Sequence, residues 1–328
     1  MRFVSIASLM MSLLLITISP AAEPEKNTKA KLPFDPYDQS AVPLEVEPPS
    51  GFTGKKIILI AGSSSHGPGD HEFFAGTTIL MNLLKQTPGV WPVMARNGWP
   101  KNEKIFDGAA TVMFYMDGRG GHPVIQKDRL QKMKKLMDAG VGWVNLHYAV
   151  DYPTKEGTQI LDWMGGYYDA QISINPHWDA QIRALPKHPI TRGVQPFTLR
   201  DEWYYNMKFV PEMKNVSPIL IAIPPDNTRG TADAKKYPGR PEIMAWAYDR
   251  ADGGRGFGFT GGHFHRNWAD ENYRRLVVNA ILWTAKVEVP EEGARVVFDP
   301  IDLNRNLDRK GKAFQKIEPP TQPGLPKK

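Results

Sequence analysis

The sequence contains no cysteine among its 328 residues. This absence excludes a cysteine nucleophile, a metal site built from thiolates, disulfide bonds and a lipoprotein anchor. An exported protein without disulfides has to rely on its hydrophobic core. The content of 41% hydrophobic and 10% aromatic residues is sufficient for such a core. The length allows one large α/β domain or two smaller ones.

The sequence also lacks the patterns that bind nucleic acids or nucleotides. Its formal net charge is +6, but the lysines and arginines are scattered, with the densest groups at 127–135 and in the last residues of the chain. No basic stripe alternates with aromatic side chains, so we expect no nucleic-acid partner. The serines at 63–65 lack a Gly-x-x-x-x-Gly-Lys arrangement, and the glycines of 253–258 lie between two predicted strands. We therefore expect no nucleotide cofactor.

Residues 1–22 have the composition of a secretory signal peptide. Arg2 supplies a positive charge, 3–18 is an apolar run, and 19–22 offers small residues for cleavage. We therefore expect an exported protein, periplasmic or extracellular, with no stable membrane span after cleavage. A retained anchor is the less favoured alternative, because the apolar run is short. Residues 23–54, rich in proline, lysine and glutamate, are predicted to be a linker or a surface strap.

Residues 55–286 carry the alternation of strands and helices that is typical of an α/β domain. This alternation predicts a mainly parallel sheet with helices on both faces. Residues 287–328 are predicted to be a polar tail with one apolar patch at 296–298. The predicted strands cover 56–61, 90–95, 111–116, 141–146, 180–184, 218–223, 243–248 and 256–260, and the predicted helices begin at His71 and cover 125–139, 157–165 and 272–286.

Histidines directly follow three of the predicted strands. His66 lies after the first strand, His147 after the fourth, and His263 with His265 after the last. The first of these loops also carries His71 and two acidic residues. Because the carboxyl ends of parallel strands meet at one edge of a sheet, we expect these loops to converge on one crevice.

Two kinds of chemistry suit such a cluster, and the sequence does not decide between them. Imidazoles with carboxylates bind zinc or a similar divalent transition metal. The metal-ligand candidates are His71, His263 and His265, the last two because alternate residues of an extended segment point to the same side. The second kind of chemistry is acid–base catalysis without a metal, because histidine titrates near neutral pH and a carboxylate can orient it. The candidate catalytic residues are His147, Glu202, His66 and Asp151.

Aromatic side chains are frequent near the same loops. Flat amphipathic rings stack on the C–H faces of pyranoses, so this pattern indicates a carbohydrate ligand. Burial in the core is the alternative, and we expect it for Trp143, Trp246 and Trp283. The candidate substrate-binding residues are Tyr148, Trp178, Trp203, Tyr204 and Trp268.

Several motifs, in order along 55–285, resemble the ThuA-like proteins, a family named for trehalose utilisation. The motifs are AGSSSHGPGDHEFFAG at 61–76, LHYAVD at 146–151, NPHW at 175–178, HPITRGVQPF at 188–197, DEWYYN at 201–206 and GRGFGFTGGHFHRNW at 254–268. The resemblance implies the fold of class I glutamine amidotransferases, a flavodoxin-like three-layer α/β/α sandwich, here with loop insertions. Those amidotransferases need a cysteine at a strand end, so its absence here excludes glutaminase activity.

The resemblance also implies a role in carbohydrate catabolism, especially of 3-keto disaccharides and glycosides. The proton next to a keto group is acidic, so a histidine or glutamate base could drive isomerisation or elimination, with or without a metal. The expected function is thus a sugar isomerase, lyase or hydrolase. A non-catalytic carbohydrate-binding or accessory protein and a metal-dependent hydrolase of another substrate are the alternatives. The implied pocket residues are His66, His71, His147, Glu202, His263 and His265.

Overall fold

The structure of the protein is a computed structural model that describes residues 32–321. The predicted signal peptide at 1–22 and the first part of the predicted linker lie outside the described residues. Of the described residues, 34–321 form one compact unit. Within 32–321, no helix is both long enough and apolar enough to cross a membrane.

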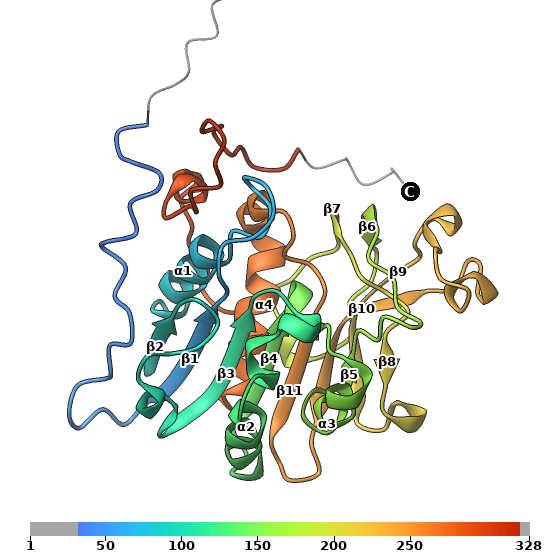
Figure 1. The fold of residues 1–328 in the computed structure, drawn as a ribbon, viewed down its shortest axis with the longest axis horizontal. Coiled ribbons are helices and arrows are strands. Elements are labelled where there is room, and N and C mark those ends of the chain that lie inside the picture. The colour runs from blue at the N-terminus through green and yellow to red at the C-terminus, as the bar shows by residue number, and fades with distance from the viewer. Residues whose placement is uncertain (1–31, 322–328) are drawn as a thin grey trace, which may run out of the picture. The chain divides into compact units, whose positions relative to one another are not determined.

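A seven-stranded sheet lies at the centre, in the order β2-β1-β3-β4-β11-β10-β9 (Figure 1). The pairs from β2 to β11 are parallel, and β10 runs antiparallel to both of its neighbours. This arrangement confirms the predicted mainly parallel sheet. The strands are β1 (Lys55–Ala61), β2 (Val90–Ala95), β3 (Ala109–Tyr115), β4 (Gly142–Leu146), β9 (Val216–Ala222), β10 (Glu242–Asp249) and β11 (Arg255–Phe259).

Helices cover both faces of this sheet and complete the predicted three-layer α/β/α sandwich. Successive residues of β1 alternate between two cores, because side chains of a strand point to opposite faces. Ile57 packs in the core that contains residues of α1 and α4, and Ile58 packs in the core that contains residues of α2 and α3. The helices are α1 (Phe73–Leu84), α2 (Arg129–Asp138), α3 (Thr154–Met164) and α4 (Glu271–Thr284).

The predicted loop insertion between α3 and β9 contains two small antiparallel sheets. One pairs β5 (Gly166–Tyr167) with β8 (Lys208–Phe209), and the other pairs β6 (His177–Ile182) with β7 (Phe197–Glu202). The strand predicted at 180–184 is β6, which begins earlier. The sequence did not predict β7, because its polar residues give no apolar alternation. In the register of this hairpin, His177 lies opposite Glu202 at the end nearest the main sheet's loops.

Both ends of the described chain pack against the domain. Near the N-terminus, the Glu45 amide donates to the Met94 carbonyl at 2.8 Å, so this segment lies as a strap along β2. The segment after α4 differs from the polar tail that we expected, because Val289, Val296 and Leu303 are buried in the core with α1 and α4. Its apolar residues are too irregularly spaced to reveal this packing in the sequence.

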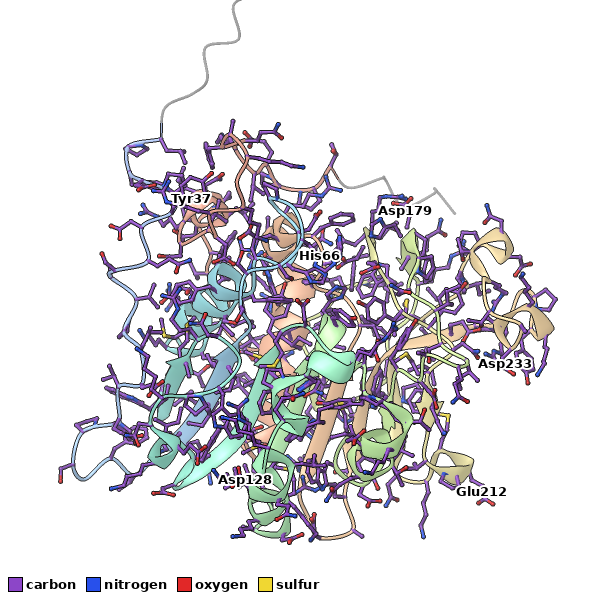
Figure 2. All side chains as sticks on the ribbon, in the orientation of Figure 1. Tyr37, His66, Asp128, Asp179, Glu212 and Asp233 are labelled. Carbon is purple, nitrogen blue, oxygen red and sulfur yellow. The ribbon has the colours of Figure 1, made fainter. Side chains whose placement is uncertain are left out.

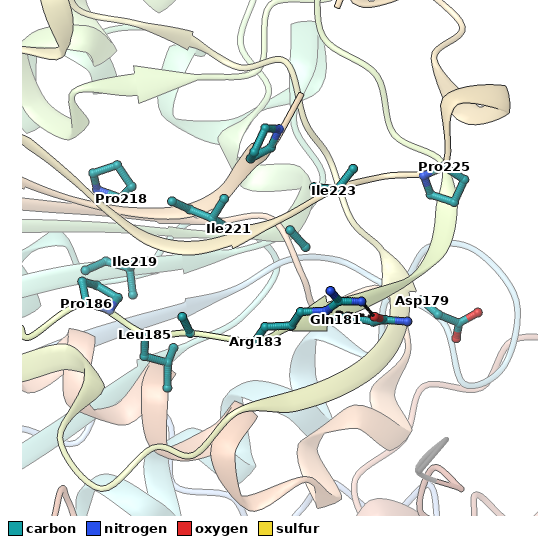
Figure 3. A pocket seen from close by; sticks show the side chains of 13 residues that line it. Asp179, Gln181, Arg183, Leu185, Pro186, Pro218, Ile219, Ile221, Ile223 and Pro225 are labelled. Carbon is teal, nitrogen blue, oxygen red and sulfur yellow. Dashed lines mark hydrogen bonds between the residues drawn. The ribbon is translucent and has the colours of Figure 1, made fainter. Parts of the chain in front are cut away.

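An apolar groove of about 790 Å³ lies between β6 and β9 (Figure 3). Arg183 reaches Gln181 within it, with an Nη2-to-Oε1 distance of 2.6 Å. None of the histidines of the strand-end loops lines this groove, which is therefore separate from the candidate site. The side chains labelled in Figure 3 are Asp179, Gln181, Arg183, Leu185, Pro186, Pro218, Ile219, Ile221, Ile223 and Pro225.

Candidate metal centre

Four strand ends bring three imidazoles and a carboxylate together. His71 lies on the loop after β1, His147 follows β4 directly, and His263 lies on the loop after β11. Glu202 is the last residue of β7. One potential ligand atom from each of the four lies within 4.8 Å of the others. We call these four residues the metal-ligand cluster.

The distances in the metal-ligand cluster fit a single small ion. The Nε2 atom of His71 lies 3.0 Å from His147 Nε2 and 3.0 Å from His263 Nδ1. The Oε2 atom of Glu202 lies 3.0 Å from His263 Nδ1 and 3.4 Å from His147 Nε2. Ligands about 2.0–2.1 Å from a tetrahedral zinc ion are separated from each other by roughly 3.4 Å. The observed spacing is close to that value.

Hydrogen bonds on the outer side of two rings fix where their lone pairs point. His147 Nδ1 lies 2.9 Å from the carbonyl oxygen of Thr260, which can only accept, so this nitrogen carries the hydrogen. His71 Nδ1 lies 3.0 Å from Asp117 Oδ1 and donates in the same way. Both Nε2 atoms therefore present lone pairs to each other at 3.0 Å. Such an arrangement needs a cation or an extra proton between them, and it is the usual orientation of metal-ligating histidines.

Burial sets the charges of the metal-ligand cluster. Burial and the neighbouring imidazoles hold the pKa of His71 far below its ordinary value, so its ring is neutral. Burial opposes ionisation of Glu202, but the adjacent His147 and His263 lower its pKa and keep it a carboxylate. Burial also opposes protonation of His263, yet the hydrogen bond to Glu202 raises its pKa.

The backbone at the metal-ligand cluster is held in an uncommon conformation. His66, His71 and His147 have φ angles of 58°, 46° and 56°, in the left-handed region that residues other than glycine rarely adopt. Gly262 has φ 122°, and a Cβ there would lie only 3.0 Å from His147 Cβ. Strain of this kind persists only where the surroundings fix it, and it concentrates at functional sites.

Asp201 fixes the loop that carries His263. Its carboxylate accepts backbone N–H bonds from Gly262, His263 and Phe264 at 2.9, 3.1 and 3.2 Å, and the Tyr273 hydroxyl at 2.8 Å. Asp201 is fully buried. Sequence reasoning gave it no role, because nothing in the sequence shows that a remote loop closes over this carboxylate.

The rim of the metal-ligand cluster carries His66 and Tyr148. The His66 ring lies 3.6 Å from that of His71, centre to centre, and is exposed; Figure 2 labels it on the loop between β1 and α1. Burial of the neighbouring surface lowers the pKa of His66, so its ring is neutral near neutral pH. Tyr148 is half-buried, with its ring centre 6.2 Å from that of His71.

Three further residues at the rim were missed by sequence reasoning. Asn175 Nδ2 donates to Glu202 Oε1 at 2.9 Å, and the Tyr168 hydroxyl donates to Asn175 Oδ1 at 3.2 Å. The His177 ring lies 4.8 Å from that of His263. All three come from the insertion, and only the NPHW motif gave a signal for two of them.

Two residues predicted for the site lie elsewhere. His265 is fully buried and begins a 3-10 helix (His265–Ala269), so the chain does not stay extended long enough to place it beside His263. It belongs to none of the potential metal-binding groups found among residues 32–321. Asp151 instead pairs with Arg119 at 3.0 Å, and burial raises its pKa to about 6.

The structure separates the five candidate substrate-binding aromatics into two groups. Trp178, Trp203 and Trp268 are at most 2% exposed and belong to the core. The β6-β7 hairpin turns the rings of Trp178 and Trp203 inward, and Trp268, in the 3-10 helix after β11, packs against Tyr115 and Tyr273. Tyr204 is also buried, but its hydroxyl lies 3.4 Å from His147 Nε2 and 3.3 Å from Glu202 Oε2. Tyr204 and Tyr148 are therefore the two aromatics placed at the metal-ligand cluster.

Comparisons with known proteins agree with the motif resemblance. A family model described as ThuA, trehalose utilisation, matches residues 73–284. The crystal structure of a ThuA-like protein from Bacteroides uniformis ATCC 8492 is 15% identical, with a TM-score of 0.51, and the match covers 73% of this chain and 94% of that one. At this identity the likeness concerns the fold.

A second crystal structure, of a ThuA-like protein from Parabacteroides merdae ATCC 43184, is 17% identical with a TM-score of 0.49. The match covers 72% of this chain and 92% of that one. A search of curated proteins finds no match.

Proposed function

This chain belongs to the ThuA family, and from that premise we propose that it is an exported enzyme of carbohydrate catabolism with a divalent transition-metal centre. Its proposed substrates are keto-sugars or glycosides, which it isomerises, eliminates or hydrolyses. The observation that carries the proposal is the pair of Nε2 lone pairs of His71 and His147, facing each other beside Glu202.

The metal-ligand cluster is suited to zinc or a similar ion. Three neutral imidazoles and one carboxylate satisfy the preference of such ions for nitrogen and oxygen ligands, and they leave one net positive charge on the complex. If a carbonyl or hydroxyl oxygen of the sugar added as a fifth ligand, a bound ion would act as a Lewis acid towards it. His147 and Glu202, which we considered as bases, point their acceptor atoms into this centre. We therefore assign them the role of ligands.

His66 is the base that the geometry favours. Its ring is exposed at the rim and neutral, so it can accept a proton from the carbon next to a keto group. Its Nδ1 lies 3.0 Å from the Ser65 hydroxyl, which orients the ring. Tyr148, whose ring lies 6.2 Å from that of His71, would supply a ring face for the sugar.

The rival function, carbohydrate binding without catalysis, has less support. It relied on tryptophans as stacking platforms, and Trp178, Trp203 and Trp268 are buried. A metal-dependent hydrolase of another substrate would use the same centre. Assays of turnover on keto-sugars therefore separate that alternative from the proposed function. Export rests on the composition of residues 1–22.

Elemental analysis and turnover of 3-keto disaccharides test this proposal together. We expect one zinc, cobalt or manganese ion per chain after reconstitution. His147→Ala and Glu202→Gln should lose both the ion and turnover, whereas His66→Gln should keep the ion and lose turnover. Full turnover by His147→Ala, or a wild-type protein that binds none of these ions, would refute the metal-centre proposal.

A further inference from the structure

A buried ion pair lies directly beneath the loop that carries His71. The Lys310 ammonium is 3.2 Å from the Glu72 carboxylate, and the two side chains are only 3% and 1% exposed. Lys310 comes from the C-terminal segment, which lies outside the 73–284 range of the family match. Charged groups are rarely buried this completely, because removing both from water is costly unless further hydrogen bonds compensate.

Every donor position of Lys310 is directed at the loop of residues 67–72. Besides pairing with Glu72, its Nζ atom donates to the carbonyl oxygens of Gly67 at 3.2 Å, of Asp70, and of His71 at 3.3 Å. These three carbonyl oxygens converge on the ammonium group only in the backbone conformation that the loop has in this structure. The ammonium therefore holds the backbone of a metal-cluster residue directly.

Glu72 connects the loop and the C-terminal segment from the other side. Its Oε1 atom accepts the Gly69 amide at 3.0 Å, and its Oε2 atom accepts the Asp308 amide at 3.0 Å. The same loop is bonded to the third cluster histidine, because the His71 amide donates to the His263 carbonyl at 3.0 Å. One buried charge pair thus holds a loop whose own backbone is bonded to a second metal-cluster residue.

The C-terminal segment is itself anchored by the N-terminal strap. Gln39 Nε2 donates to the Asn306 carbonyl and to Asp308 Oδ1, both at 3.1 Å, and the Leu307 amide donates to the Pro36 carbonyl at 2.9 Å. Figure 1 shows this segment, in red, next to α1 and the loop that precedes it. Two segments remote in sequence therefore support the loop after β1.

We propose that Lys310 and Glu72 are positioning residues that hold the strained loop carrying His66 and His71 in the conformation needed for the site. The left-handed backbone of both histidines, φ 58° and 46°, requires such outside support. The inference rests on the proposed function in one respect only, namely that His71 binds a metal ion. The hold on the loop is a property of the chain itself.

Hydrogen–deuterium exchange of the metal-free, full chain tests the inference. In Lys310→Met, which keeps the length but removes the charge and its donors, we expect peptides covering 66–72 to exchange about tenfold faster or more. Peptides from β1 and α4 should be unchanged. The matched control is Lys312→Met, an exposed lysine of the same segment, which should behave as wild type. Unchanged exchange of 66–72 in Lys310→Met would overturn the proposal.

The double variant Glu72→Gln/Lys310→Met guards against simple misfolding, because it leaves no unpaired buried charge. It should fold and show the same local loss of protection, and protection equal to wild type would again overturn the proposal. Cobalt or zinc titration gives the second measurement. We expect metal affinity to fall about 10- to 100-fold in the double variant. If the wild-type protein binds no metal, the proposed function is refuted. The exchange experiment still tests the positioning role of Lys310 and Glu72, because it uses the metal-free chain.

Discussion

The Nε2 atoms of His71 and His147 lie 3.0 Å apart, although the residues are 76 positions apart in the chain. The Nδ1–H group on the outer side of each ring donates a hydrogen bond, from His71 to the Asp117 carboxylate and from His147 to the Thr260 carbonyl. The two lone pairs repel unless a cation or an extra proton lies between them. This relationship is the reason why we propose a metal site rather than a metal-free acid–base pair, and the first prediction tests that proposal.

Removing the outer partner of His71 should weaken metal binding without unfolding the protein. In Asp117→Ala the His71 ring loses the acceptor that fixes its orientation, so we expect affinity to fall about 10- to 100-fold. Competition with a chelator measures this change. Asp107→Ala, at an exposed aspartate before the opposite end of β3, is the control. Equal affinities of Asp117→Ala and wild type would show that the ring is not oriented by this contact.

Replacing the rim histidine should separate catalysis from metal binding. In His66→Gln we expect kcat on 3-keto disaccharides to fall about 10²- to 10⁴-fold, because a general base is lost. Metal content should stay at the wild-type level, since His66 belongs to a separate group with His71 and Asp117 and supplies no ligand to the metal-ligand cluster. Steady-state kinetics measure the change in kcat, and elemental analysis measures the metal content. Wild-type turnover would assign the base elsewhere.

The aromatics of the core and of the rim should respond in opposite ways. Trp203→Ala should lower the free energy of unfolding by about 3–5 kcal/mol, because it leaves a cavity at a fully buried site. Tyr148→Ala should change stability little and raise KM, because Tyr148 is half-buried at the rim. Urea unfolding and kinetics distinguish them. A small stability loss in Trp203→Ala with a raised KM would return Trp203 to the substrate site.

His122 should make the protein less stable in acid. Its ring is fully buried, and burial lowers its pKa from 6.5 to about 3. Between these values the unfolded chain binds the proton and the folded chain does not. Stability is therefore complete above pH 6.5 and falls with decreasing pH, by up to about 1.4 kcal/mol per pH unit from this residue.

The variant His122→Asn isolates this contribution. Asparagine can still accept the Val124 amide, which His122 Nδ1 accepts at 3.2 Å, but it does not titrate. Urea unfolding at several values between about pH 4 and 7 should give a shallower pH dependence for the variant. Parallel curves for variant and wild type would mean that His122 titrates normally.

The regular elements were largely predictable, because their signals are local. The prediction for β2 at 90–95 matches its bounds, and the prediction for β10 differs by one residue at each end. The strand β7 was missed, because its sequence FTLRDE pairs only within the insertion. Because this strand was missed, no role was predicted for Asp201, whose carboxylate accepts one hydrogen bond from the adjacent Glu202 amide and four from residues far along the chain.

The aromatic and histidine candidates show where local reasoning failed. An extended path at 263–265 would place both histidines on one side, but the chain enters a 3-10 helix at His265. The tryptophans of the insertion were expected in the pocket because of their neighbours in sequence. Their burial depends on how the β6-β7 hairpin packs against α4 and the main sheet, and that packing is not encoded in the spacing of residues.

The sequence by itself determined the layered α/β fold, the absence of any thiol chemistry and the placement of histidines at strand ends. These follow from periodicity and composition, which act over a few residues. Only the tertiary structure decided which nitrogen of each ring faces the centre, that Glu202 joins three histidines there, and that Lys310 supports their loop from the far end of the chain. Such relations depend on contacts between segments up to 243 residues apart, whose geometry is set by packing.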